Sequence, residues 1–227
     1  MIIMQIDPQL LLTFLPRFRD HLTDLRSNDI PADEDRTTEH LSFLVDFLET
    51  EYAPILRKIG NLIAHGEITF DLLWAILLPQ SVIFTSCGTT SEPRAVRLRE
   101  ISQSTDPMSR APYWSLACEY IDANENFAFL GQQFGLATMM LKIQNFEGVV
   151  KIAELSAYPI EWHPSAGEVR SKLIRRGRKW VELSGVHHKH YKGVAYRNSF
   201  KVKVSLASNC LQIGKLTVSH IRSTVAS

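Results

Sequence analysis

The first quarter of the chain carries apolar side chains at the three- and four-residue spacing of amphipathic helices. Asp7 is placed to cap a first helix, which Pro8 opens at a position that needs no backbone N–H. We expect Pro16 to interrupt this helix, since proline removes one hydrogen bond from a helix interior. The polar run at residues 27–35 predicts an acidic loop.

A second helix begins at Thr37 or Thr38 and keeps its apolar stripe through Ile63. Pro54 should bend or split it, and Gly66 should end it. A short third helix is expected over 69–78, with its first residue as the cap and Pro79 as the stop.

The middle of the chain changes to short apolar runs separated by Gly, Pro, Asn or Asp, which is typical of strands. The expected strands are Val82–Phe84, Ala95–Ile101, Tyr113–Ile121, Leu136–Ile143 and Val149–Leu155. No strand–helix–strand alternation accompanies them, so the pattern favours an antiparallel sheet over a parallel one. Two further strands are expected near the C-terminus, at Tyr191–Arg197 and Phe200–Leu206.

One amphipathic helix is predicted between these groups of strands. Ser165 and Glu168 form a capping box, which starts a helix over Ala166–Leu183. Its apolar residues, Gly177 among them, gather on one side. That glycine either permits close packing, which we favour, or marks a break in the helix. Its cations cover the rest of the helix surface: Arg170, Lys172, Arg175, Arg176, Arg178 and Lys179.

These elements predict one α+β fold: an N-terminal helical lobe, a central mostly antiparallel sheet, and the basic helix packed on that sheet. We divide the chain into a helical extension with its acidic loop at 1–36, an α+β domain at 37–197, and a tail at 198–227. At 227 residues, 45% of them hydrophobic, the chain can bury a core of that size.

Charge is divided unevenly along the chain. From Glu168 onward there are 13 Lys or Arg and 2 acids, whereas residues 1–167 hold 12 basic and 22 acidic residues. The net charges of these segments are +11 and −10, although the whole chain carries +1. Such asymmetry indicates either an anionic partner or docking between the two halves.

The remaining composition indicates an intracellular protein, cytoplasmic or nuclear. The three cysteines lie far apart without a paired spacing, which favours reduced thiols. The N-terminal apolar run lacks the basic start of a signal peptide. The longest uncharged stretch, 72–91, contains Pro79 and a polar second half, so we expect no membrane-spanning helix.

Five phrases, taken in order, resemble a known family. They are Gly66-Glu-Ile-Thr-Phe-Asp-Leu-Leu-Trp74, Phe146-Glu-Gly148, Ile152-Ala-Glu-Leu-Ser-Ala-Tyr-Pro159, Leu173-Ile-Arg-Arg-Gly-Arg178 and His188-Lys-His-Tyr-Lys-Gly193. Together they are similar to the domain of unknown function that precedes the AAA+ ATPase module in large filamentous-fungal proteins. The resemblance covers about residues 40–196, and it implies a fold and a domain context rather than a mechanism. Residues 198–227 depart from the family's usual continuation.

The chain contains no phosphate-binding loop of the GxxxxGK[ST] type, so it cannot hydrolyse ATP by that route. Each resembling phrase also has a structural reading, and we expect Trp74 to be a core residue. His188 and His190 are weak candidates for a shared metal, because no third ligand follows them. Glu119 and Asp122 are expected to be solvated at a strand end. We therefore assign no catalytic residue and no cofactor.

The basic helix allows three interpretations: a surface for nucleic acid or anionic lipid, a docking helix for a protein, or a solvated face. The favoured function is a non-catalytic interaction or substrate-recruitment domain with a protein partner. The first alternative is an enzyme or small-molecule binder that uses a cavity on the sheet, for example in fungal secondary metabolism. The second is an anionic-surface or nucleic-acid binder that uses the basic C-terminal third. The sequence leaves the oligomeric state open.

Overall fold

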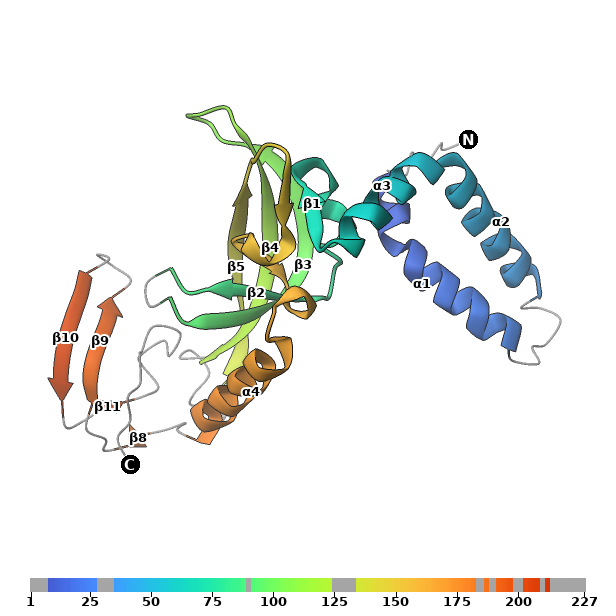
Figure 1. Ribbon diagram of the computed structural model, residues 1–227. Helices are drawn as coiled ribbons and strands as arrows, with labels where there is room; N and C mark the ends of the chain where they lie inside the picture. The colour runs from blue at the N-terminus through green and yellow to red at the C-terminus, as the bar shows by residue number, and fades with distance from the viewer. Residues whose placement is uncertain are drawn as a thin grey trace, which may run out of the picture. The chain divides into compact units, whose positions relative to one another are not determined.

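The computed structural model describes residues 8–27, 35–88, 91–123, 134–182, 186–187, 191–197, 202–208 and 211–212. The chain divides into two compact units: residues 1–78 with 145–154, and residues 79–144 with 155–227. Figure 1 shows the elements of both, and helices combine with antiparallel strands to give the predicted α+β class. The predicted segments 1–36, 37–197 and 198–227 do not coincide with these units and stay a prediction.

The first unit opens with three helices: α1 (Pro8–Ser27), α2 (Asp35–Glu51) and α3 (Ala53–Ala64). α1 and α2 pack together and bury Leu12, Leu15, Leu22, Val45 and Leu48. Between them, Arg19 Nε lies 2.7 Å from Glu49 Oε1. The interruption expected at Pro16 is wrong, since α1 continues through that residue. Buried leucines on both sides of Pro16 hold the two halves in one helix despite the lost hydrogen bond.

The predicted effects of Pro54 and Gly66 are confirmed. α2 ends at Glu51 and α3 starts at Ala53, so Pro54 lies in the first turn of a new helix, where no N–H is needed. Gly66 has φ +64°, the left-handed conformation that ends many helices, and its N–H donates to Ile63 O at 2.9 Å.

The third helix differs from the prediction. It is a short 3₁₀ helix, η1 (Phe70–Ala75), preceded by strand β1 (Glu67–Thr69). Thr69 stands at the N-cap position of η1, as predicted, but its side chain makes no capping hydrogen bond. It pairs with Val149 of β6 (Val149–Lys151), and its buried hydroxyl has no hydrogen-bond partner among the described residues. Tertiary pairing with a segment eighty residues away therefore overrides the local capping signal.

Trp74 belongs to the core of the first unit, as predicted. It is 3% exposed, and Ile68, Phe70 and Leu73 beside it are also buried. Phe70 meets Phe146 edge to face, with ring centroids 5.7 Å apart. Strand β6 continues into the 3₁₀ helix η3 (Ile152–Glu154), and the Ile152 N–H donates to Gly66 O at 2.9 Å.

The second unit contains a five-stranded antiparallel sheet in the order β5-β4-β3-β2-β7. Its strands are β2 (Val82–Ser86), β3 (Pro93–Thr105), β4 (Pro112–Ala123), β5 (Phe134–Gln144) and β7 (Ala157–Pro159). The four longer ones confirm the predicted strands and extend them. One face of the sheet is buried and carries Ile83, Val96, Leu98, Leu116, Cys118 and Ile143.

The sheet curls until its two ends approach each other. Ser156, directly before β7, joins them: its Oγ donates to Lys142 O of β5 at 3.1 Å, while its own carbonyl accepts from Thr85 Oγ1 at 2.9 Å. The closure is local, because β4 is the only described strand that pairs with β5. Most of the outer edge of β5 is thus left without a neighbouring strand among the described residues.

The rest of the second unit consists of the 3₁₀ helix η4 (Ile160–Trp162), helix α4 (Ala166–Glu182) and two small antiparallel pairs. The pairs are β9 (Tyr191–Arg197) with β10 (Val202–Ser208), and β8 (Val186–His187) with β11 (Leu211–Gln212). β9 has its predicted bounds, whereas β10 lies two residues later than expected. At the start of α4, the Ser165 N–H donates to Nδ1 of His163 at 3.0 Å, so His163 takes the donor that the predicted capping box assigned to Glu168.

No helix in the described part of the chain is long and apolar enough to cross a membrane. The uncharged stretch at 72–91 forms most of η1 and all of β2 instead.

Replacing Trp74 by alanine should lower the free energy of unfolding by about 3–5 kcal/mol, because a large buried side chain is removed and leaves a cavity. Urea denaturation monitored by circular dichroism measures the change. Phe43→Ala is the matched control, since Phe43 is 74% exposed and its removal should change stability by no more than about 0.5 kcal/mol. Equal effects of the two substitutions would contradict the assignment of Trp74 to the core.

Candidate interaction surfaces

Helix α4 is the predicted basic helix, and half of its six predicted binding cations are held within the second unit. Arg170 Nη2 lies 3.1 Å from Glu161 Oε1, and Lys172 Nζ lies 3.8 Å from Glu92 Oε2. Arg176 Nη2 donates to Pro93 O at 2.8 Å. These contacts place the helix against β3 and η4, so part of the charge division is used in contact. Exposed pairs of this kind contribute only about 0–1 kcal/mol each.

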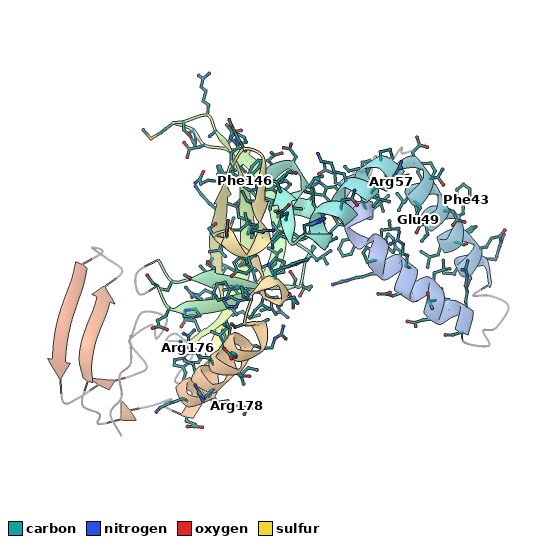
Figure 2. All side chains as sticks on the ribbon, in the orientation of Figure 1. Phe43, Glu49, Arg57, Phe146, Arg176 and Arg178 are labelled. Atoms are coloured by element: carbon teal, nitrogen blue, oxygen red, sulfur yellow. The ribbon has the colours of Figure 1, made fainter. Side chains whose placement is uncertain are left out.

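The other three cations, Arg175, Arg178 and Lys179, are exposed and make no hydrogen bond or ion pair with any described residue. Their three- and four-residue spacing puts them on one side of the helix. Figure 2 labels Arg178, one of these three, and Arg176, one of the cations held within the unit, on α4. The sequence predicted all six as one binding set. In the described part of the structure, three of them make contacts within the unit and three make none.

The apolar side of α4 is only partly covered. Trp180 contacts Phe134 of β5, with ring centroids 4.8 Å apart, but no residue of α4 is buried. Ile174 and Val181 are each half exposed. Gly177 lies between them, and a Cβ added there would meet no described atom within 4 Å. The close packing expected at Gly177 is therefore not found among the described residues.

A second apolar surface lies on the outer face of the sheet, on β4 and β5. Ile121 and Leu136 are direct cross-strand partners, and Met140 follows on the same face, opposite Ala117. Ile121, Leu136 and Met140 are 58%, 64% and 60% exposed. Sequence reasoning identified both strands but not this surface, because alternation alone does not say which face of a strand is covered.

Glu119 lies within this face and is buried, which contradicts its expected solvation. Its carboxylate pairs with Arg97, its cross-strand partner on β3, and lies 3.7 Å from Arg99 Nε. A β-bulge between Leu98 and Glu100 shifts the register at Arg99 and brings a second guanidinium to the same carboxylate. The sequence signal was Arg-Leu-Arg on one strand, but its acidic partner could be found only from the register.

A third surface lies in the first unit, on the side of α2 that faces away from α1 (Figure 2). Phe43 and Phe47, one helical turn apart, are both exposed. Exposed Glu39 and Asp46 lie on the same side, and neither pairs with a described cation. This surface is aromatic at its centre and acidic at its rim.

The described residues offer little for catalysis. No three His, Cys, Asp or Glu side chains gather among them in a way that could hold a metal. The weak metal candidates His188 and His190 lie outside the described residues. Burial raises the pKa of the Cys118 thiol to about 11, which makes it a poor nucleophile. Burial likewise raises the pKa of Tyr158.

Residues 58–164 match a family model described as a domain of unknown function, DUF7025. No curated protein and no solved structure matches the chain. The matched region runs from within α3 to just before α4, so it includes the five-stranded sheet but neither α1, α2 nor α4. The comparison supports an uncharacterised domain, and the association with AAA+ ATPases stays a resemblance.

Cys118 should resist alkylation in the folded protein. With its pKa raised to about 11, roughly one thiol in a thousand is ionised at about pH 8. Iodoacetamide treatment followed by peptide mass spectrometry should find Cys118 unmodified in the native chain and modified after unfolding in urea. Full modification of Cys118 without urea would contradict its burial and would show that this thiol is reactive in the folded protein.

Gly177→Ala should raise the free energy of unfolding by about 0.5–1 kcal/mol, because alanine favours a helix interior and the added methyl meets open space. Gly148→Ala is the matched control. It also has open space, but its φ of +74° is unfavourable for alanine, so this variant should be less stable than the wild type. If Gly177→Ala also lowers stability, α4 has a packing partner there after all.

Proposed function

We propose that this chain is a non-catalytic protein-binding module that takes an extended segment of a partner protein as an added strand beside β5. The observation that carries the proposal is the outer edge of β5, which has no neighbouring described strand and carries exposed apolar side chains. Strand addition of this type is a common mode of peptide recognition.

As far as the described residues show, the edge of β5 lacks the usual protection of natural edge strands. Such strands are commonly short, charged, bulged or interrupted by proline, because an open edge pairs readily with other chains. Residues 136–141 read Leu-Ala-Thr-Met-Met-Leu, with neither a charge nor a proline. The bond from Ser156 to Lys142 O lies beyond one end of that run, and the Phe134–Trp180 contact lies before its other end. A partner strand would give the open backbone groups their hydrogen bonds.

The side chains around this edge indicate which segments would bind. Leu136 and Met140 project from the exposed face of β5, and Ile121 extends that face onto β4. A segment with apolar residues at alternate positions would place them beside this row. Methionine is flexible and polarisable, so Met140 can adapt to different partner side chains.

The resemblance of five sequence phrases to the domain that precedes AAA+ modules supports the narrower proposal that the bound segment belongs to a recruited substrate. The buried thiols do not favour the enzymatic alternative, because Cys118 has a raised pKa and Cys87 is buried.

A display library of eight-residue peptides, selected on the full chain, tests this function. We expect selected peptides with alternating apolar residues, and we expect them to slow amide hydrogen exchange within Phe134–Leu141. Met140→Lys should weaken binding at least about tenfold, because it places a charge in the apolar row. Isothermal titration of one selected peptide into each variant measures the effect.

Met108→Lys is the matched control, since it makes the same substitution in the turn between β3 and β4, where Met108 is 96% exposed. It should leave peptide affinity unchanged. Peptides that bind Met140→Lys as tightly as wild type, or that protect amides elsewhere, would contradict the proposal.

A further inference from the structure

The outer face of α4 carries exposed aliphatic and basic side chains that neither hold the helix to the described part of the fold by hydrogen bonds or ion pairs nor belong to the edge of β5. This face consists of Ile174, Val181, Arg175 and Arg178, all exposed, around Gly177. A glycine in a helix interior destabilises the helix by about 1 kcal/mol relative to alanine. No described atom comes close enough to require it, so a contact from outside the chain would explain both the glycine and the two half-exposed aliphatic side chains.

The outer face of α2 has the opposite character. Phe43 and Phe47 form its centre, and Glu39 and Asp46 form its rim. No described atom lies within 4 Å of a Cβ at Gly177, so an aromatic ring of a partner would meet no side chain there, and acids at its rim would meet Arg175 and Arg178. The two faces are therefore complementary: aromatic side chains would meet aliphatic ones, and acidic side chains would meet arginines.

We propose that copies of this chain associate head to tail, with the outer face of α4 of one copy against the outer face of α2 of the next. Every copy carries both faces, so the contact is heterologous and can be repeated from copy to copy. The net charge of the sequence is −10 before Glu168 and +11 from there on. The acidic face of α2 belongs to the negative segment, and the arginines of α4 belong to the positive one. The proposal is independent of the strand-binding function, which uses a different surface.

Nucleic acid is the competing occupant of the α4 face. Phosphates would bind to Arg175 and Arg178, but they would make no use of Ile174 and Val181, which lie beside them half exposed. Three further cations of the helix are already held by Glu161, Glu92 and Pro93 O. These observations favour an apolar and acidic protein surface.

Sedimentation velocity of the full chain over a range of concentrations tests the proposal. The wild type should show a mass average that rises with concentration at low salt and falls when salt is added. Phe43→Ser and Arg178→Glu should each weaken self-association at least tenfold, since each removes one of the two faces. An equimolar mixture of the two variants should form a one-to-one complex and nothing larger, because each brings one intact face.

Two controls separate the contact from general effects. Arg57→Glu makes the same charge reversal on exposed Arg57 of α3, whose Nε donates to Ala53 O of its own helix, and it should associate as wild type does. Asp46→Arg combined with Arg178→Glu restores opposite charges across the contact and should recover association. Thermal unfolding of every variant shows that the fold is retained.

A wild type that stays monomeric throughout the concentration range overturns the proposal. So does a mixture of Phe43→Ser and Arg178→Glu that fails to associate, which would indicate a symmetric contact of one face with itself. Tight, salt-sensitive binding of duplex DNA that Arg178→Glu abolishes would also overturn it and assign the face to nucleic acid.

Discussion

Backbone N–H and C=O groups on the free side of an edge strand need hydrogen-bond partners. In the described part of this protein, no strand pairs with the outer side of β5, the long edge strand of the five-stranded sheet. The sheet curls far enough for Ser156 to reach Lys142 of β5, while no described strand other than β4 pairs with β5. A fully closed sheet would have no edge to offer, and a flat one would separate β7 from β5. The partial closure gives a curved sheet whose long edge strand among the described residues is β5, and the proposed binding function depends on that geometry.

Most of the described ion pairs of the second unit hold the sheet and α4 in place, and they say little about a partner. The buried Glu119 is held between Arg97 and Arg99 on the outer face, because a buried carboxylate needs paired charges. α4 is held by Arg170 against η4, and by Lys172 and Arg176 against the start of β3. What remains after these contacts is a smaller set of cations beside exposed aliphatic residues, opposite in character to the aromatic and acidic face of α2. The charge division of the sequence is thus partly structural and partly available for contacts between molecules.

Much of the fold could be predicted from the sequence, because it is specified by local signals. Pro54 and Gly66 set helix boundaries as expected, and the period of apolar residues located the four longer strands of the sheet. The errors arise where distant segments meet. Thr69 pairs with Val149 in a strand and its side chain makes no capping hydrogen bond, and Glu119 finds its arginines only through the β3–β4 register and a bulge. Pro16 remains within a helix because neighbouring leucines are buried.

The candidate surfaces were less predictable than the fold. The cations of α4 were evident as a set, but only the structure separates those that hold the helix from those that are exposed. The exposed row of Ile121, Leu136 and Met140 could not be distinguished from core, because apolar alternation looks the same on either face of a sheet. Gly177 was interpreted as a packing residue of the fold, but no described atom lies within 4 Å of a Cβ added there.

Residue-resolved amide hydrogen exchange of the monomeric chain tests whether the outer edge of β5 is open. In a strand paired on one side, amides that donate to β4 are protected and amides that point outward are not. We therefore expect protection to alternate from residue to residue along 134–141. Uniform slow exchange throughout that segment would show that the edge is already covered within the chain, and would contradict the proposed function.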